Sequence, residues 1–110
     1  MARLDHVAIN VSDIAWYIDF FSRAFGMTVV DTDVKNDQIH QAWLDGGIQI
    51  IQTPTFSHAS SSVLAHIAIK VDNLSDAITR VKLSGGTAMQ KGENWFQLPG
   101  DVYLELLDGS

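Results

Sequence analysis

Apolar and polar residues alternate along two six-residue stretches of the chain, and each stretch begins with a histidine. The first is His-Val-Ala-Ile-Asn-Val at 6–11, and the second is His-Ile-Ala-Ile-Lys-Val at 66–71. A period of two is typical of a β-strand, because successive side chains point to opposite faces of a sheet. We therefore predict two strands whose β-branched residues share one face, while the histidines and the small or polar residues share the other.

A helix is predicted after each of these strands. The candidate N-caps share a side-chain oxygen: they are Ser12 or Asp13 for the first helix, and Asp72, Asn73 or Ser75 for the second. Apolar residues at helical spacing are Trp16, Phe20 and Ala24 in the first helix, and Leu74, Ala77, Ile78 and Val81 in the second. Glycines are expected to end the helices, at Gly26 and at Gly85–Gly86.

Three short strands are predicted after each helix. They cover roughly Thr28–Thr32, Gln38–Leu44 and Ile48–Thr53 in the first half, and roughly Thr87–Gln90, Asn94–Leu98 and Val102–Leu107 in the second. Turn-forming residues separate the last two strands of each half, as Asp45-Gly46-Gly47 and as Pro99-Gly100-Asp101. Each half therefore has the order β-α-β-β-β.

The two halves are copies of one module. The histidine strands match at an offset of 60 residues, as do Gly26 and Gly86, and the last strands match at an offset of 56. The first module spans about 3–53, the second about 64–108, and 54–63 forms a Ser-rich linker within a single domain, 1–110. We expect an α+β fold in which two modules, from one chain or from two, form a curled mixed sheet (a half-barrel) with the helices outside.

Four side chains are expected to converge in the hollow of that sheet. His6 and His66 lie on the faces turned away from the helices, and the repeat places Gln49 and Glu105 at equivalent positions on the last strands. Two neutral imidazoles and a carboxylate suit one divalent transition metal (Zn, Ni, Fe or Mn), and the absence of cysteine leaves only nitrogen and oxygen ligands. Gln49 would either add a weak amide ligand or lie beside the metal.

Further residues are candidates for contacts with a substrate. Those expected to line the cavity are Tyr103, Asn10, Lys70, Trp43 and Phe96. The alternative for the aromatic residues is a place in the core, and the alternative for Lys70 is a place in water beyond the cavity. The remaining histidines, His40 and His58, are expected to be solvated.

Composition and charge exclude several classes of partner. The 110 residues are 46% hydrophobic and carry a net charge of −6, without a basic cluster that nucleic acid or an anionic membrane would require. Neither a signal peptide nor an apolar membrane span is recognisable, so a cytoplasmic location is the default expectation. A homodimer is expected, because a chain of this length leaves sheet edges to cover.

The chain resembles the vicinal oxygen chelate superfamily, which includes glyoxalases, extradiol dioxygenases, fosfomycin-resistance transferases and bleomycin-binding proteins. The resemblance rests on three segments: Leu4-Asp5-His6-Val7-Ala8-Ile9 before a helix ending Phe25-Gly26-Met27, the segment 66–74, and Leu98-Pro99-Gly100-Asp101 leading into Val102–Leu106. It implies paired β-α-β-β-β modules and a metal at the positions of His6, Gln49, His66 and Glu105.

Three functions are compatible with this resemblance. The first is a glyoxalase-like lyase or isomerase, in which the metal chelates neighbouring oxygens of a small substrate and Glu105 is the catalytic base. The second is a mononuclear non-haem iron dioxygenase. The third is a metal-free protein of the bleomycin-resistance type that sequesters a small molecule, using Trp95, Phe96 and Tyr103.

Overall fold

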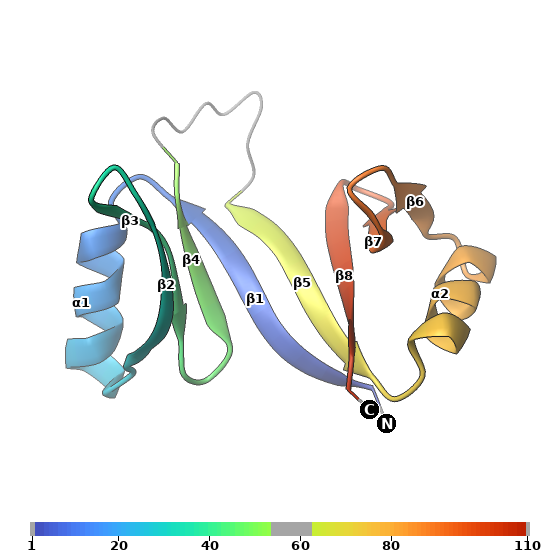
Figure 1. The fold of residues 1–110 in the computed structure, drawn as a ribbon, viewed down its shortest axis with the longest axis horizontal. Helices are drawn as coiled ribbons and strands as arrows, with labels where there is room; N and C mark the ends of the chain where they lie inside the picture. The colour runs from blue at the N-terminus through green and yellow to red at the C-terminus, as the bar shows by residue number, and fades with distance from the viewer. Residues whose placement is uncertain (1, 54–62, 110) are drawn as a thin grey trace. The chain divides into compact units, whose positions relative to one another are not determined.

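The computed structural model describes residues 2–53 and 63–109, which fold as two β-α-β-β-β repeats of the α+β class (Figure 1). The first repeat contains β1 (Arg3–Val11), α1 (Ile14–Phe25), β2 (Val29–Lys35), β3 (Gln38–Leu44) and β4 (Ile48–Gln52). The second contains β5 (Leu64–Val71), α2 (Leu74–Leu83), β6 (Thr87–Met89), β7 (Gly92–Leu98) and β8 (Val102–Asp108). The predicted element order is confirmed, while 54–62, with most of the predicted linker and His58, lies outside the described residues.

The chain divides into two compact units whose boundaries fall within β1 and β5. One unit is Val7–Ala65, and the other combines the residues up to His6 with those from His66 onward. His6 therefore belongs to the same compact unit as His66 and Glu105. Gln49, Trp43 and Asn10 belong to the other unit.

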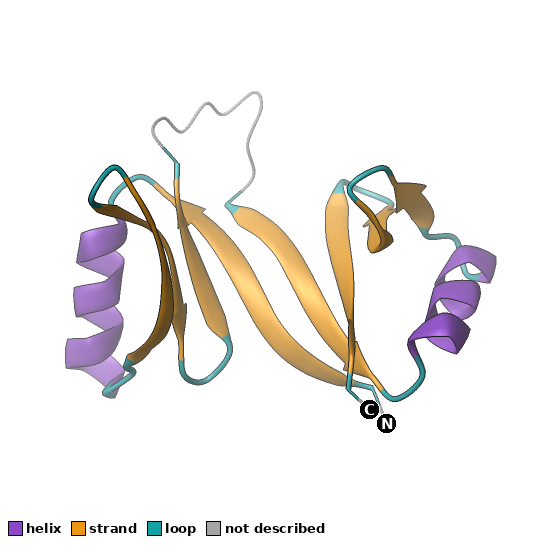
Figure 2. Ribbon diagram, in the orientation of Figure 1, coloured by secondary structure: helices purple, strands orange, loops and turns teal. Residues whose placement is uncertain are grey.

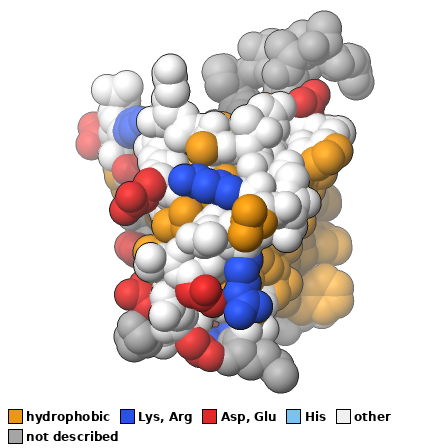
Figure 3. Space-filling view, turned by 90° about the vertical axis from the view of Figure 1, so that its right-hand side faces the viewer, with side chains coloured by type: hydrophobic (Ala, Val, Ile, Leu, Met, Phe, Trp, Pro, Cys, Tyr) orange, Lys and Arg blue, Asp and Glu red, His pale blue; other side chains and the backbone are white. Residues whose placement is uncertain are grey.

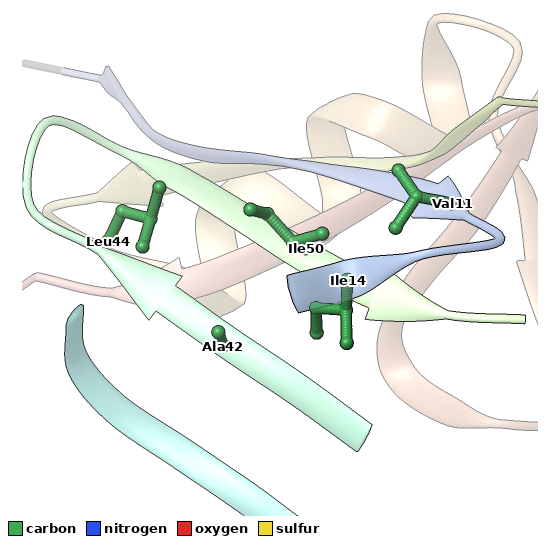
Figure 4. Close-up of a cluster of buried hydrophobic side chains, with 5 residues drawn as sticks. All are labelled: Val11, Ile14, Ala42, Leu44 and Ile50. Carbon is green, nitrogen blue, oxygen red and sulfur yellow. The ribbon is translucent and has the colours of Figure 1, made fainter. Parts of the chain in front are cut away.

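The unit Val7–Ala65 has the strand order β2-β3-β4-β1, with β1 parallel to β4 and the other pairs antiparallel. Its core is a cluster of buried aliphatic side chains, shown in Figure 4: Val11, Ile14, Ala42, Leu44 and Ile50. Helix α1 packs against this cluster through Tyr17, Ile18 and Phe21. Trp16 is instead 50% exposed, so it does not lie on the packed face of the helix.

Capping explains where α1 begins and ends. The carboxylate of Asp13 accepts a hydrogen bond from the Trp16 backbone N–H at 3.2 Å, as expected of an N-cap. Gly26 ends the helix in the left-handed conformation, which glycine adopts without steric cost. Both ends agree with the sequence prediction.

Strand β2 is longer than the predicted Thr28–Thr32, because a turn that the sequence analysis missed follows it. Asn36 and Asp37 both have positive φ, 52° and 62°. Two such residues form the tight hairpin turn whose twist matches antiparallel strands. Strand β2 therefore continues to Lys35 and pairs with Gln38 of β3.

The other unit repeats this arrangement with a smaller core. Its strand order is β5-β8-β7-β6, with β5 parallel to β8 and the other pairs antiparallel. Val71, Phe96 and Leu106 are buried, and the predicted apolar stripe of α2 packs on them through Leu74, Ala77, Ile78 and Val81. Asn73 is the N-cap of α2, which ends at Leu83, before the predicted glycines.

Each helix covers a face of the strands of its own repeat, as colouring by secondary structure shows (Figure 2). The outer surface on the α2 side carries Lys, Arg, Asp and Glu side chains interspersed with neutral ones, without a large patch of one sign (Figure 3). No helix among the described residues has the length and apolarity needed to cross a bilayer.

Candidate metal centre

The two histidines of the repeat meet. His6 lies on β1 and His66 on β5, which are neighbours in the strand order. Their Nε2 atoms are 3.1 Å apart, and the rings meet edge to face with centroids 5.2 Å apart. Residues 60 positions apart in the sequence therefore direct the same nitrogen at one point.

Glu105 completes the group from β8. Its strand partners are Ala68 on β5 and Trp95 on β7, so these three side chains share a face of the sheet. Its Oε1 atom lies 3.8 Å from Nε2 of His6 and 3.6 Å from Nε2 of His66. The side chains of His6, His66 and Glu105 are 14%, 11% and 19% exposed, so the cluster is largely withdrawn from water.

The spacing of these three atoms fits a single metal ion. Nitrogen and oxygen ligands bind divalent metals at about 2.0–2.2 Å, so two ligands of one ion lie at most about 4.3 Å apart. The separations of 3.1, 3.6 and 3.8 Å all satisfy this limit. His6, His66 and Glu105 form a group of potential ligand atoms within 4.8 Å of one another.

A neighbouring carboxylate orients His6. The Nδ1 atom of His6 lies 2.8 Å from Oδ2 of Asp5, and the second oxygen of Asp5 lies 3.3 Å from Nζ of Lys70. The hydrogen bond from His6, together with the Lys70 ammonium, holds the pKa of Asp5 below its ordinary value. When Nδ1–H donates to Asp5, the Nε2 atom of a neutral His6 carries a lone pair.

An aromatic ring orients His66 instead. Trp95 meets His66 edge to face with centroids 4.9 Å apart, and Nζ of Lys91 lies 3.9 Å from the centroid of the Trp95 ring. Burial, with the neighbouring His6 and Lys91, lowers the pKa of His66 from 6.5 to about 4, despite the Glu105 carboxylate at 3.6 Å. His66 is therefore neutral at pH 7, as a metal ligand must be.

Burial also raises the pKa of the Glu105 carboxyl, while His6 and Lys91 partly offset this effect. A carboxylate with few water neighbours is unfavourable without a counter-charge. A divalent cation on the three ligand atoms would provide that charge. The donor set and its electrostatics therefore fit the metal that the sequence predicts.

Gln49, the predicted fourth member, lies in the other compact unit. It is buried on β4, and its Nε2 donates a hydrogen bond to Oε1 of Gln41 at 2.6 Å. Gln41 in turn donates to Oδ2 of Asp33 at 3.4 Å. This relay uses the amide nitrogen of Gln49 and leaves its oxygen free of that bond, so a role as metal ligand stays a prediction.

The structure also locates the predicted substrate residues. Tyr103 is partly buried, and strand alternation puts it on the same face as Glu105. Trp43 pairs with Gln49 across β3 and β4, which makes it the counterpart of Trp95. Asn10 lies on β1 opposite Ile51 of β4. These three remain candidates.

One of the predicted substrate contacts does not fit the structure. Phe96 is 0% exposed and belongs to the core under α2, because it lies on the face of β7 opposite to Trp95. Lys70 is 35% exposed and its ammonium pairs with Asp5 at 3.3 Å, so its contact with a substrate stays a prediction. His40, expected to be solvated, is partly buried and lines a cleft of about 730 Å³ at the start of α1.

Three residues were not recognised from the sequence: Asp5 and Lys91 near the cluster, and, in the other compact unit, Gln41 beside Gln49. Asp5 directly precedes His6, and this adjacency was the available signal, although it did not reveal that the carboxylate reaches back to Nδ1. Lys91 lies beyond β6, in the turn before β7. Its approach to Trp95 depends on how the turn folds, which no local pattern predicts.

Comparison with known proteins assigns the family. The profile of the Glyoxalase/Bleomycin resistance protein/Dioxygenase superfamily matches residues 3–94, and the chain belongs to this superfamily. This confirms the resemblance described above. Among curated protein sequences, none matches the chain.

Solved structures of the same fold include two epimerases and a dioxygenase. Methylmalonyl-CoA epimerase from Mycobacterium tuberculosis has a TM-score of 0.69 and 22% identity, over 97% of this chain and 87% of that one. An S115T variant of the Streptomyces coelicolor epimerase, in complex with 2-nitronate-propionyl-CoA, has a TM-score of 0.67 and 20% identity, over 98% and 94%. The 2,3-dioxygenase LapB from Pseudomonas sp. KL28 has a TM-score of 0.70 and 16% identity, with 98% of this chain covering 42% of that enzyme.

Proposed function

We propose that the protein is a metal-dependent isomerase or lyase of the glyoxalase type, which acts on a small substrate with neighbouring oxygens. The observation that carries this proposal is the convergence of His6, His66 and Glu105, whose potential ligand atoms lie within 4.8 Å of one another. One divalent metal (Zn, Ni, Fe or Mn) would be held by these three side chains, with Gln49 as a candidate fourth ligand. When bound, the metal supplies Lewis acidity that stabilises negative charge on the substrate's oxygens.

Glu105 is the proposed proton acceptor. It is the one carboxylate among the three clustered side chains, and a carboxylate within reach of a carbon next to a carbonyl group can accept a proton from it. His66 is neutral at pH 7, so it is not an imidazolium that could donate a proton to the substrate. Gln49, the counterpart of Glu105 in the repeat, cannot accept a proton, so the proposed transfer uses one face of the substrate.

The side chains around Glu105 suit a small polar substrate. Trp95 provides an aromatic wall beside His66, and Tyr103 shares the face of Glu105. Lys91 lies over Trp95 and adds a positive charge, which favours a substrate with an anionic group. The epimerases of the same fold support this reaction class, since epimerisation next to a carbonyl is also a proton transfer at carbon.

A second candidate is a mononuclear iron dioxygenase. Two histidines and one carboxylate with open positions are the ligand set of non-haem iron oxygenases. The observations in its favour are the same three side chains, His6, His66 and Glu105, and the fold shared with a 2,3-dioxygenase. The identity of the metal distinguishes the two candidates.

The proposal also includes a homodimer and, as the sequence suggests, a cytoplasmic location. Strand β2 is the outermost strand of its unit and carries exposed apolar side chains, including Val30 and Val34. Such an edge is usually covered by another chain or protected from pairing. Light scattering coupled to size-exclusion chromatography measures the oligomeric state, and a monomer at micromolar concentration would contradict this part.

Metal analysis of the purified protein is the first test. We expect close to one Zn, Ni, Fe or Mn per site in the wild type, and loss of that metal in His6→Ala and His66→Ala. His40→Ala is the matched control and should retain it. A wild type that is purified without metal and also fails to bind any of these ions would contradict the proposal. The remaining alternative would then be a metal-free protein that sequesters a small molecule.

Exchange of substrate hydrogen with solvent is the second test. In D₂O, the metal-loaded protein should introduce deuterium next to the carbonyl of members of a panel of small 2-oxo acids, hemithioacetals and acyl thioesters, followed by NMR. Glu105→Gln should abolish the exchange. Oxygen uptake by the iron-loaded protein with a panel of catechols, without deuterium exchange, would favour the dioxygenase instead.

A further inference from the structure

Asp5 connects the cluster to a cation by using both of its carboxylate oxygens. Oδ2 lies 2.8 Å from Nδ1 of His6, and Oδ1 lies 3.3 Å from Nζ of Lys70. Both side chains are only about one-third exposed, at 31% for Asp5 and 35% for Lys70. The contact with Lys70 therefore restricts rotation of the carboxylate that holds the imidazole.

The repeat shows that this arrangement belongs to one histidine only. The residue before His66 is Ala65, whose side chain has no group that could accept a hydrogen bond from an imidazole. His66 is in contact with the Trp95 ring instead. The two equivalent histidines are therefore oriented by different means, and only His6 directly follows a carboxylate residue in the sequence.

The tautomer of His6 decides whether it can bind a metal through Nε2. A neutral imidazole carries its proton on one nitrogen and a lone pair on the other. The 3.1 Å contact between the two Nε2 atoms also requires one lone pair and one N–H, so His66 donates if His6 accepts. A proton held at Nδ1 of His6 by Asp5 satisfies both conditions.

We propose that Asp5 is a positioning residue that holds His6 in its Nδ1–H tautomer with Nε2 directed at the cluster, and that Lys70 holds Asp5 in place. This inference deepens the proposed function and, for its effect on metal binding, rests on it. Lys70, which the sequence suggested as a substrate contact, would then restrain the carboxylate that positions His6. Carboxylates that hold ligating histidines typically change metal affinity by about 10- to 100-fold when removed.

A purely structural role predicts a different outcome. Partly exposed Asp–Lys pairs stabilise proteins by only about 0–1 kcal/mol, and their loss has no effect on a specific imidazole. The Asp76–Arg80 pair on α2 is an exposed ion pair with a 3.0 Å contact and no connection to His6. It provides the matched control, as Asp76→Ala.

The first measurement uses metal-free protein labelled with ¹⁵N at histidine. Long-range ¹H–¹⁵N spectra in mildly alkaline buffer distinguish the two tautomers of each neutral ring. We expect the Nδ1–H form of His6 in the wild type and in Asp76→Ala, and a shift towards the Nε2–H form in Asp5→Ala. Asp5→Asn, which keeps an acceptor oxygen and nearly the same shape, should give an intermediate result and serves if Asp5→Ala does not fold.

The second measurement is the affinity for Zn²⁺, by competition with a chromophoric chelator. We expect binding to weaken by about 10- to 100-fold in Asp5→Ala, less in Asp5→Asn and Lys70→Met, and not in Asp76→Ala. An Nε2–H tautomer of His6 in the wild type, or an unchanged tautomer in both Asp5 variants, would overturn the inference. A wild type with the expected tautomer but without affinity for Zn²⁺, Ni²⁺, Fe²⁺ or Mn²⁺ would refute the proposed function while leaving the role of Asp5 intact.

Discussion

The two modules have the same strand pairing, but the sheet faces that their helices leave uncovered carry different chemistry. In the first module, Gln49 of β4 faces Trp43 and donates to Gln41. In the second, Glu105 of β8 occupies the same register position, faces Trp95, and lies 3.6 Å from His66. The first face carries an amide relay from Gln49 through Gln41 to Asp33, and the second carries a group of potential metal ligands.

This difference separates architecture from reactivity. Both modules keep an apolar face against the helix, and both place a tryptophan beside the residue at the ligand position. The face that includes β8 combines a carboxylate with His6 and His66 and can hold a proton or a divalent cation, whereas the amide of Gln49 cannot accept a proton. Duplication therefore explains the fold, while a few substituted side chains explain the asymmetry of the site.

The largest effect is expected in the core of the second module. Phe96→Ala removes the main side chain of a small cluster and should lower the free energy of unfolding by about 3–5 kcal/mol. Leu83→Ala, at an exposed end of α2, should stay within about 0.5 kcal/mol of the wild type. Urea unfolding measures both, and a stable Phe96→Ala protein with impaired substrate binding would restore Phe96 as a pocket residue.

Glu105→Gln makes the second face resemble the first. Loss of the charged ligand should weaken metal binding by more than the roughly 100-fold typical of supporting residues, which is about 3 kcal/mol or more. Glu93→Gln, an exposed carboxylate on β7, is the control. Equal metal affinity in the wild type, Glu105→Gln and Glu93→Gln would show that Glu105 is not a ligand. Tighter metal binding by Gln49→Glu would support a contribution from the first module.

The pH dependence of stability tests the burial of His66. Its pKa is 6.5 when unperturbed and about 4 in the folded protein, so between these values the unfolded chain binds more protons. The metal-free protein should therefore lose stability as the pH falls from 6.5 to 4, by up to about 3 kcal/mol from this residue. In urea unfolding, His66→Gln should remove this part of the dependence and His40→Gln should not; identical profiles for wild type and His66→Gln would contradict it.

The smallest effect concerns the amide relay of the first module. Gln41→Leu removes the acceptor of the buried Gln49 amide and should destabilise the protein by about 1–3 kcal/mol. Gln38→Leu, an exposed position on the same strand, is the matched control. If both variants are equally stable in urea, the relay does not hold Gln49.

Much of the fold was predictable because its signals are local. Alternation identified the apolar faces of β1 and β5, and side-chain oxygens and glycine marked the ends of α1. The length of β2 was missed, because the turn at Asn36–Asp37 lacks glycine and these residues adopt positive φ only as part of the hairpin. The α1 residue Trp16 was misleading for a related reason: a helical pattern shows which residues share a face, but the sheet decides which face is covered.

The group of potential ligands was predictable to a similar extent. His6, His66 and Glu105 were identified from the repeat and the family resemblance, and the structure brings their ligand atoms together. Phe96 was misassigned because its orientation depends on the register of β7 against β8, which pairs Trp95 and not Phe96 with Glu105. The partners of the ligands, Asp5 with Lys70 and Trp95 with Lys91, also depend on contacts between strands or across a turn.

The amino-acid sequence by itself determined the duplicated β-α-β-β-β modules, the faces of their strands and the residue types available to a metal. These properties follow from periodicities of a few residues, which do not depend on how distant segments meet. Only the tertiary structure decided that two imidazole nitrogens lie 3.1 Å apart, that a carboxylate from β8 joins them, and that Lys70 faces Asp5. Such distances are set by strand pairing and packing, because a shift of one residue in register would turn these side chains to the opposite face.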